Sequence, residues 1–463
     1  MATADTVARL RSTLGAGGVL TGADAGPFSH DWPHEIAWTP LCVARPADRD
    51  GVVEVLRIAR EDRVPVVPVG GNTGLSGGTK GEGAIMLSLE RMNRIRDIRH
   101  DARTMTVEAG VVLQTIREAA AAHDLVFPLT FGAQGSARIG GCLATNAGGS
   151  NVVRYGSARA LCLGIEVVLA SGEVLDLMSS VRKDNTGYDL RDLFIGSEGT
   201  LGVITAAVLR LFPRPETYAT AMVAAPDLAA ALTILNRLQS GTGGQVEAFE
   251  YMPRNYIEAW KAHRPETGEP FAQPYDVNLL VEIGASAGAD ADARLEDLLA
   301  AMMDEGLVLD ATFARSEAQR RAMWARREAA GELTVLRPHV LLNDVSLPLE
   351  NVAGFVARIL PALREIDPGV DDFLMSHLGD GNVHYNIWPS RGDPALHERL
   401  RARMEDLVAE MGGSFSAEHG IGVSKLGAMA RRKDQVALDV MRRIRAALDP
   451  DGLLNPGKTV PEA

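Results

Sequence analysis

The stretch Val67-Pro-Val-Gly-Gly-Asn-Thr-Gly-Leu-Ser-Gly-Gly-Thr79 holds five glycines within nine residues and begins inside an apolar run, Val64 to Val69. The apolar run predicts a buried strand that opens into a glycine-rich turn. Because glycine tolerates positive φ, successive backbone N–H groups there can point into one concavity and bind a pyrophosphate without a lysine. Taken alone, the stretch would also suit a flexible surface loop.

A second glycine-rich segment runs from Pro128 to Ser150 and reads PLTFGAQGSARIGGCLATNAGGS. We expect the longer stretch from Phe127 to Tyr155 to be irregular, which is uncommon inside a compact domain unless the segment binds something. Its small side chains would let the backbone approach a large, flat ligand. Together the two segments predict a dinucleotide cofactor. No GxGxxG motif with an acidic partner follows a strand, which argues against a nicotinamide-binding Rossmann fold.

The rest of the chain alternates between strand-like and helical patterns, and Pro213 and Pro215 predict a domain boundary. The middle region, with helices alternating with strands, predicts an antiparallel α+β unit. Expected strands are Ala84 to Leu89, Met105 to Ala109, Leu163 to Ala170, Gly202 to Leu211, 277–284 and 341–347. Expected helices are 47–62, Leu113 to His123, 226–240, 289–305, 317–333, 394–411 and a final helix containing Val436, Val440, Ile444 and Leu448.

Length and composition narrow the class of protein. A chain of 463 residues should form two or three packed units. The formal net charge of −13 argues against nucleic acid as the main partner, and three cysteines without a CxxC motif argue against a disulfide framework. The N-terminus predicts a short amphipathic helix rather than a signal peptide, and no apolar run approaches 18 residues. We therefore expect a cytoplasmic protein.

Two short motifs near the C-terminus carry candidate metal ligands. His377 and His384 flank a Gly-Asp-Gly-Asn turn, which can bring two strand ends together so that both imidazoles face one point. With Glu418 of the motif SAEHGIG they would make a site of two histidines and one carboxylate, which suits a catalytic Zn²⁺ or Mn²⁺. The neighbouring His419 could then act as a base. Asp380 is an alternative ligand, and isolated histidines more often play a hydrogen-bonded structural role.

One further motif is a chance match. Gly452-Leu-Leu-Asn-Pro-Gly-Lys-Thr459 fits the GxxxxGK[ST] pattern of nucleotide-binding P-loops. That motif needs a strand before it and a helix after it, whereas here we expect a helix before it and none after it.

These motifs, taken together and in order, resemble those of the FAD-linked oxidases of the vanillyl-alcohol-oxidase type, in the branch of D-lactate, glycolate and D-2-hydroxyglutarate dehydrogenases. The likeness covers nearly the whole chain. It implies an α+β protein with a bipartite FAD-binding domain over 1–214 (subdomains of about 1–100 and 101–214). An antiparallel α+β substrate and metal-binding cap domain over 215–415 would follow, then a C-terminal helical segment, 416–463, that carries the catalytic histidine and returns to the FAD domain. The motifs are PVGGNTGLSGGT, FGAQGSARIGGCLATNAGGSNVVRYGSAR, GYDLRDLFIGSEGTLGVIT, SHLGDGNVHYNI, SAEHGIG and LLNPGK.

The resemblance also implies roles for individual residues. His377, His384 and Glu418 match metal ligands, and His419 matches the catalytic base. Arg327 matches an arginine that grips a substrate carboxylate, and Asn386 matches a polar substrate contact. Residues implied to bind FAD are Gly70, Gly71, Asn72, Thr73, Gly74, Ser76, Gly77, Ser136, Gly140, Gly141, Thr145, Asn146, Gly148, Gly149, Glu198, Gly202, Ile204 and Asn455.

Departures from the family pattern bear on the flavin linkage and the substrate. Relatives with covalent flavin place a histidine near the glycine loops, and none lies between Val64 and His100, so we expect non-covalent FAD. Relatives that oxidise D-2-hydroxyglutarate tend to carry a lysine where this chain has Leu342, and Gly331 stands where they can show a hydroxyl residue. Arg337 or His339 could substitute.

The expected reaction is oxidation of a D-2-hydroxy acid, D-2-hydroxyglutarate or a related acid, to the 2-oxo acid by hydride transfer to flavin N5. Zn²⁺ is the expected metal, with Mn²⁺ as the alternative. An electron-transfer flavoprotein or a quinone is the expected acceptor, which allows a position peripheral to the inner membrane; a homodimer is allowed. The alternatives are a respiratory D-lactate or glycolate dehydrogenase, an oxidase that uses O₂, a non-catalytic flavoprotein subunit and, more distantly, a metal-dependent hydrolase.

Overall fold

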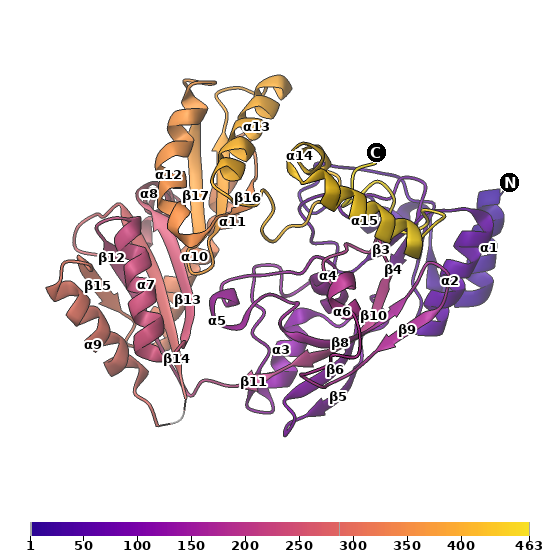
Figure 1. Cartoon of the computed structure of the whole chain (residues 1–463), viewed down its shortest axis with the longest axis horizontal. Coiled ribbons are helices and arrows are strands. Elements are labelled where there is room, and N and C mark those ends of the chain that lie inside the picture. Colours follow the sequence, from indigo (N-terminus) through magenta and orange to yellow (C-terminus); the bar gives the residue numbers. More distant parts are fainter. Residues whose placement is uncertain (1, 287, 463) are drawn as a thin grey trace. The chain divides into compact units, whose positions relative to one another are not determined.

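The computed structural model describes residues 2–286 and 288–462, which divide into two compact units (Figure 1). The first unit contains the chain up to Gly148, Gly156–Arg214 and the segment from Glu418 onward. The second contains Gly149–Tyr155 and Pro215–Ala417. Compared with the boundaries expected at 214 and 415, these units differ chiefly in Gly149–Tyr155, which packs with the second unit.

The first unit is built on two main sheets. A four-stranded sheet has the order β1-β2-β4-β3, in which β2, β4 and β3 run parallel. A five-stranded antiparallel sheet has the order β5-β6-β10-β8-β9, and β11 pairs with β7. The strands are β1 Val19–Leu20, β2 Cys42–Ala44, β3 Val66–Val69, β4 Ile85–Ser88, β5 Ile95–Arg99, β6 Thr104–Glu108, β7 Leu125–Val126, β8 Cys162–Val168, β9 Val174–Leu177, β10 Val203–Arg210 and β11 Phe212–Pro213.

The helices of the first unit follow from local sequence signals. In α2, the Asp48 side chain accepts a hydrogen bond from the Gly51 amide and caps the N-terminus, while Arg63 ends the helix in the left-handed conformation. Its apolar stripe, which includes Val52 and Leu56, is fully buried against the four-stranded sheet. The helices are α1 Ala2–Leu14, α2 Arg49–Asp62, α3 Leu113–Ala121, α4 Ile139–Ala144, α6 Leu190–Phe194, α14 Leu426–Arg432 and α15 Gln435–Leu448, with short 3₁₀ helices η1 Ala16–Gly18 and η2 Gly22–Phe28.

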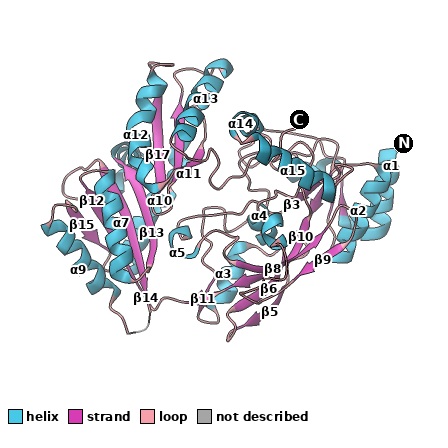
Figure 2. Cartoon of the chain, in the orientation of Figure 1, coloured by secondary structure: helices cyan, strands magenta, loops and turns pink. Residues whose placement is uncertain are grey.

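The second unit is a seven-stranded antiparallel sheet with the order β15-β12-β14-β13-β17-β18-β16 (Figure 2). Its strands are β12 Thr217–Ala225, β13 Val246–Pro253, β14 Val277–Ala285, β15 Asp310–Phe313, β16 Asp344–Ser346, β17 Asp371–His377 and β18 Asn382–Trp388. Its helices are α5 Val152–Tyr155, α7 Leu228–Thr242, α8 Arg254–His263, α9 Ala291–Asp304, α10 Glu317–Glu328, α11 Ala330–Thr334, α12 Leu349–Arg364 and α13 Pro394–Glu410, with the 3₁₀ helix η3 Pro265–Thr267.

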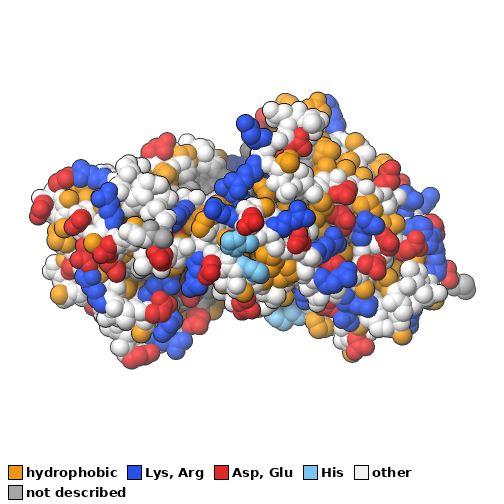
Figure 3. Space-filling model, turned by 90° about the horizontal axis from the view of Figure 1, so that it is seen from below, with side chains coloured by type: hydrophobic (Ala, Val, Ile, Leu, Met, Phe, Trp, Pro, Cys, Tyr) orange, Lys and Arg blue, Asp and Glu red, His pale blue; other side chains and the backbone are white. Residues whose placement is uncertain are grey.

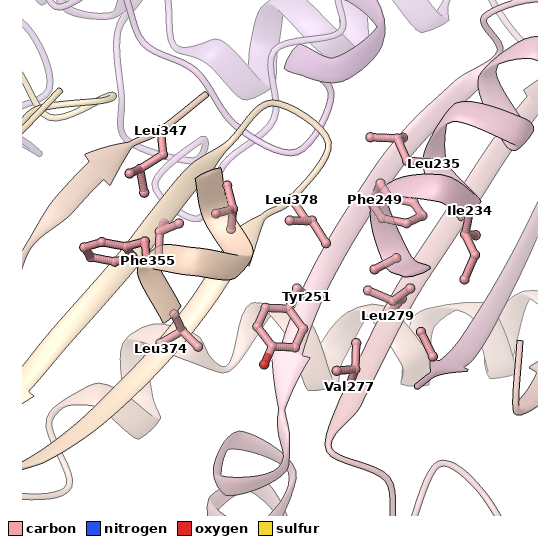
Figure 4. Close-up of a cluster of buried hydrophobic side chains, with 14 of the residues drawn as sticks. Ile234, Leu235, Phe249, Tyr251, Val277, Leu279, Leu347, Phe355, Leu374 and Leu378 are labelled. Atoms are coloured by element: carbon pink, nitrogen blue, oxygen red, sulfur yellow. The ribbon is translucent and has the colours of Figure 1, made fainter. Parts of the chain in front are cut away.

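Side-chain alternation gives this sheet two different faces. Phe249 and Tyr251 of β13 and Leu374 of β17 join a large apolar core with helices α7, α9, α12 and α13, part of which Figure 4 shows. On the other face, Met252 and Phe373 pack with α8, α10 and α11 in a separate apolar cluster. Along each strand, the residues that alternate with those of the large core therefore face the second cluster. This second face carries the candidate substrate site.

Several expectations about the elements were wrong. The stretch Phe127 to Tyr155 is not irregular throughout, because it contains α4 and α5. In α4 the close approach of Gly140 to Ala109, whose carbonyl accepts the Gly140 amide at 2.8 Å, stabilises a helix that glycines alone would disfavour. The helix expected over 317–333 breaks at Ala329 into α10 and α11. Strand β12 was missed because four of its nine residues are alanines, which have low strand propensity.

Two other expectations concern the C-terminus and membranes. Helix α15 precedes Gly452-Thr459 and no helix follows it up to Glu462, so the P-loop reading is excluded by its structural context. Within residues 2–286 and 288–462, no helix combines the length and the apolar character needed to cross a membrane.

Candidate functional site

The two glycine-rich segments lie against each other in the first unit. A Cβ atom built on Gly70 would lie 3.2 Å from the Gly141 Cα, and one on Gly71 would collide with the Ser136 carbonyl oxygen. Neither glycine could be replaced without moving backbone. A Cβ on Gly74, by contrast, would meet nothing within 4 Å. The two segments predicted to share a ligand therefore meet, and beyond their contact the first loop borders open space.

Asn455 ties this region to the C-terminal tail. Its Nδ2 donates to the carbonyl oxygens of Gly78 at 3.0 Å and Glu198 at 2.7 Å. Asn455 is 1% exposed, yet among the described residues its Oδ1 has no hydrogen-bond partner. A buried acceptor without a donor is costly, so a ligand that brings an N–H or O–H there would relieve it. This orphaned oxygen and the open space at Gly74 fit a bound dinucleotide such as FAD.

Other residues predicted to contact FAD are engaged within the protein. The Asn146 Oδ1 accepts from the Ser157 hydroxyl at 2.8 Å and the Arg159 amide at 3.0 Å. The Thr145 hydroxyl donates to the Gly141 carbonyl at 3.1 Å, and the Glu198 carboxylate accepts from backbone amides of residues 421 and 422. Gly202 and Ile204 are buried in and beside β10. Their hydrogen bonds give Asn146, Thr145 and Glu198 a role in shaping the surface formed by the two glycine-rich segments, which we call the glycine-rich cradle.

A cluster of five polar side chains lies on the second face of the seven-stranded sheet, which we call the polar face. Glu250 of β13 pairs with His377 of β17, and His384 of β18 lies opposite Asp344 of β16. The same side-chain alternation places Asn386 of β18 on this face. Since all five side chains come from neighbouring strands, the sheet register alone brings them together. The turn between β17 and β18 sets the His377 and His384 rings 5.2 Å apart, as the sequence predicted.

Arg327 of α10 completes a charged triad with Glu250 and His377. Its Nε donates to Glu250 at 2.6 Å, and its Nη2 lies 2.9 Å from His377 Nε2. The His377 Nδ1 lies 2.9 Å from Glu250 Oε1. Burial alone would raise the pKa of the Glu250 carboxyl, but Arg327 and His377 lower it to about 2. Glu250 is therefore an anion in the folded protein and fixes the arginine and the imidazole.

The second histidine has a carboxylate neighbour. His384 Nδ1 lies 3.7 Å from Asp344 Oδ1, and Asp344, which is 1% exposed, accepts from Asn382 Nδ2 at 2.8 Å. Asp380, the alternative ligand, lies in the turn, where it accepts from the Asn382 amide at 3.1 Å. Burial raises the pKa of Asp380 to about 6, against the charge of His377.

The donor set of this face fits a divalent metal in part. Asp344 and His384 can offer ligand atoms close together. A metal-bound histidine usually donates its other ring N–H to a carboxylate, which is what His377 Nδ1 can do toward Glu250. Its Nε2 would then face the metal, and Arg327 Nη2, now 2.9 Å away, would have to turn aside.

Glu418 and His419 open the C-terminal segment of the first unit. The preceding residue, Ala417, belongs to the second unit, where its amide donates to the Asp344 carbonyl at 3.2 Å. Glu418 therefore directly follows a residue whose backbone amide is anchored at the polar face.

The remaining candidates lie on or near the second face. The Asn386 Nδ2 donates to the Thr334 hydroxyl of α11 at 3.1 Å. A Cβ on Gly331 would meet nothing within 4 Å, so a side chain could be accommodated there. Of the two residues expected to substitute for the lysine, Arg337 pairs with Asp371 at 2.8 Å and stacks on Trp388, and His339 is exposed.

Two residues of the polar face were not singled out from the sequence, Glu250 and Asp344. Glu250 stands between Phe249 and Tyr251 in an otherwise apolar strand, and a charged residue at a buried strand position signals a partner. On the face of the molecule seen in Figure 3, acidic and basic side chains are interspersed.

The first unit, with its glycine-rich cradle, and the second, with its polar sheet face, define a two-domain FAD-binding fold. The fold matches p-cresol methylhydroxylase (TM-score 0.76, 18% identity, 100% of this chain and 97% of that chain). It also matches 4-ethylphenol oxidase from Gulosibacter chungangensis (TM-score 0.74, 19% identity, 100% and 98%).

The family model for the FAD binding domain matches residues 40–178. The family model for the C-terminal domain of FAD linked oxidases matches residues 214–459. The chain is 37% identical over 440 residues to the mitochondrial D-2-hydroxyglutarate dehydrogenase of Bos taurus (94% of this chain, 79% of the relative). It is 36% identical over 442 residues to the D-2-hydroxyglutarate dehydrogenase of Xanthomonas citri pv. viticola (94% and 92%). The chain belongs to the family of FAD-linked oxidases and is an FAD-dependent oxidoreductase.

Proposed function

We propose that this enzyme oxidises a D-2-hydroxy acid, in the first instance D-2-hydroxyglutarate, to the corresponding 2-oxo acid. The observation that carries the proposal is the polar face of the second unit, where Arg327, His377 and His384 lie together on one side of a sheet. An arginine that can bind a carboxylate beside potential metal ligands suits a 2-hydroxy acid. The relatives named D-2-hydroxyglutarate dehydrogenase, at 36–37% identity, favour the same substrate class.

Arg327 would bind the substrate carboxylate. Its Nε is held by Glu250 at 2.6 Å, which fixes the plane of the guanidinium before substrate arrives. A guanidinium so oriented can present two parallel N–H donors to a carboxylate and decide which face of the acid is turned toward the flavin. Asn386 would add a polar contact from the same sheet face.

His419 would accept the hydroxyl proton. A neutral imidazole is suited to this role near neutral pH, and general-base catalysis typically contributes 10²–10⁴-fold. FAD, held by the glycine-rich cradle and Asn455, supplies the hydride acceptor when bound. His377, His384 and Glu418 would hold a divalent metal, Zn²⁺ before Mn²⁺, whose chemistry is to lower the pKa of a bound hydroxyl. Asp344 is a further candidate ligand, since it lies 3.7 Å from His384.

Leu342 bears on the choice of substrate, because it stands where relatives that oxidise D-2-hydroxyglutarate tend to carry a lysine. Without that cation, a second carboxylate on the substrate would lack its counterion, which favours a less charged acid. D-lactate or glycolate is therefore the second candidate substrate, for a respiratory dehydrogenase. An electron-transfer flavoprotein or a quinone would take the electrons onward.

The test is anaerobic reduction of the bound flavin. D-2-hydroxyglutarate, D-malate, D-lactate and glycolate are added in turn to the yellow protein, and loss of the visible flavin absorbance is followed. We expect D-2-hydroxyglutarate to bleach the flavin and its L-enantiomer to leave it oxidised. Bleaching by none of the acids would refute the proposed function, and a colourless purified protein would favour a hydrolase instead. Peroxide formation in air would identify an oxidase.

A further inference from the structure

Four successive backbone amides, at residues 421–424, are held by only two acceptor residues. The Ile421 and Gly422 amides each donate to one oxygen of the Glu198 carboxylate, both at 2.8 Å. The Val423 and Ser424 amides donate to the Ser76 carbonyl at 2.9 and 3.2 Å. This loop directly follows His419, so its anchors decide where that residue is held.

Two glycines of the loop are shaped to these anchors. Gly420 has φ 72°, and a Cβ built there would lie 3.0 Å from the Glu198 carboxyl carbon. Gly422 has φ 51°, and a Cβ there would collide with the Ser76 carbonyl oxygen. Other residues would be strained in this left-handed conformation and would also push the loop away. The close approach of loop to carboxylate therefore depends on glycine at both positions.

Glu198 is itself held in an unusual conformation. Its φ is 53°, which is uncommon for a residue with a side chain, and the residue is 9% exposed. Its amide donates to the Ala144 carbonyl of α4 at 2.8 Å, and its carbonyl accepts from Asn455 at 2.7 Å. Strained residues persist only where their surroundings fix them, often at functional sites. Every polar group of Glu198 thus joins the glycine-rich cradle or the tail to the loop.

We propose that Glu198 is a positioning residue that fixes the loop 420–424 against the FAD-binding cradle and thereby sets the place of His419. This inference rests on the proposed function, in which His419 is the base. It differs from a direct contact with the cofactor, which the sequence predicted for Glu198, because both carboxylate oxygens are occupied by loop amides. The loop, the cradle and Glu198 all belong to the first unit.

The test compares Glu198→Gln with wild type, both loaded with FAD. A carboxamide offers one acceptor oxygen in place of two, so an N–H group of glutamine would face a loop amide. We expect hydrogen exchange at the amides of 421 and 422 to accelerate at least about tenfold, the loss expected for one hydrogen bond to a charged group. We expect flavin reduction by D-2-hydroxyglutarate to slow about 10²-fold with little change in substrate affinity, as for a catalytic group misplaced by about 1 Å.

The control is Glu82→Gln, since Glu82 also accepts a backbone amide, that of Thr39 at 3.0 Å, in the same unit. It should leave both measurements unchanged. Gly420→Ala should reproduce the effects of Glu198→Gln, because the added methyl group would push the loop away from the Glu198 carboxylate. Its control is Gly83→Ala, because Gly83 has φ 64° and open space around it.

Unchanged hydrogen exchange at the amides of 421 and 422 in both Glu198→Gln and Gly420→Ala would overturn the proposal. Faster exchange with a normal rate of flavin reduction would also overturn it. Loss of FAD from Glu198→Gln while the fold is retained would also overturn it and make Glu198 a cofactor-holding residue. If no hydroxy acid reduces the wild-type flavin, the proposed function fails, while the exchange comparison still decides whether Glu198 anchors the loop.

Discussion

Replacing Glu250 by glutamine should destabilise the second unit strongly, because Glu250 is the shared anion of Arg327 and His377. The three side chains are 1%, 12% and 6% exposed, so the cation left behind would be buried. A carboxyl whose pKa falls from 4.5 to about 2 on folding contributes about 3 kcal/mol at neutral pH. Removing one partner of a buried ion pair costs a similar amount, about 3–5 kcal/mol.

The same shift fixes how the effect depends on pH. Because the pKa of Glu250 is lower in the folded protein, its contribution is fully present well above pH 4.5 and is lost as the pH falls toward 2. As far as the titration of Glu250 is concerned, the difference in stability between wild type and Glu250→Gln should therefore be constant from pH 8 to pH 6. It should narrow below pH 4.5.

The assay is thermal unfolding of the FAD-loaded proteins at several pH values. A loss of about 3 kcal/mol in a unit of this size should lower the Tm by about 6–12 °C. Glu305→Gln is the matched control, because Glu305 pairs with Arg237 at 2.6 Å but is 48% exposed, and its loss should leave the Tm unchanged. A shift for Glu250→Gln as small as that of the control, or one that does not narrow in acid, would refute the reasoning.

Three further variants test the site. Arg327→Lys should raise KM for the hydroxy acid at least about tenfold with the flavin spectrum unchanged, since a lysine cannot form the paired N–H contacts; a normal KM would contradict the substrate role. His419→Asn should keep the yellow FAD but lower kcat by about 10²–10⁴-fold, measured at saturating substrate, and normal turnover would show that another group is the base. Asn455→Ala should weaken FAD binding about tenfold in a fluorescence titration, because its amide groups tie the cradle to the tail; unchanged affinity would show that the orphaned Oδ1 does not meet the cofactor.

The sequence predicted the parts of the fold that depend on local patterns. The strand and turn from Val66 to Thr79 form as expected, because a continuous apolar run followed by glycines has few other solutions. The short helix α4 was not predicted, since its glycines disfavour a helix and packing contacts such as that of Gly140 with Ala109 stabilise it. Strand β12 was missed for the same kind of reason, because its alanines acquire strand structure only between β14 and β15.

The candidate site was predictable to the extent that its residues lie in motifs. The Gly-Asp-Gly-Asn turn indicated that His377 and His384 would meet, and the sheet brings their rings together. Glu250 lies 127 residues from His377, so only the pairing of β13 with β17 reveals their contact. The anchoring of 421 and 422 by Glu198, more than 220 residues away in sequence, likewise has no local signal.

The most direct test of the proposed reaction is the transfer of the hydrogen from the substrate carbon to the flavin. The measurement is the rate of anaerobic flavin bleaching by D-2-hydroxyglutarate and by the same acid carrying deuterium at C2, in rapid-mixing experiments at saturating substrate. Hydride transfer from C2 predicts that the deuterated acid bleaches the flavin severalfold more slowly. Equal rates for the two acids, or no bleaching by either, would contradict the account.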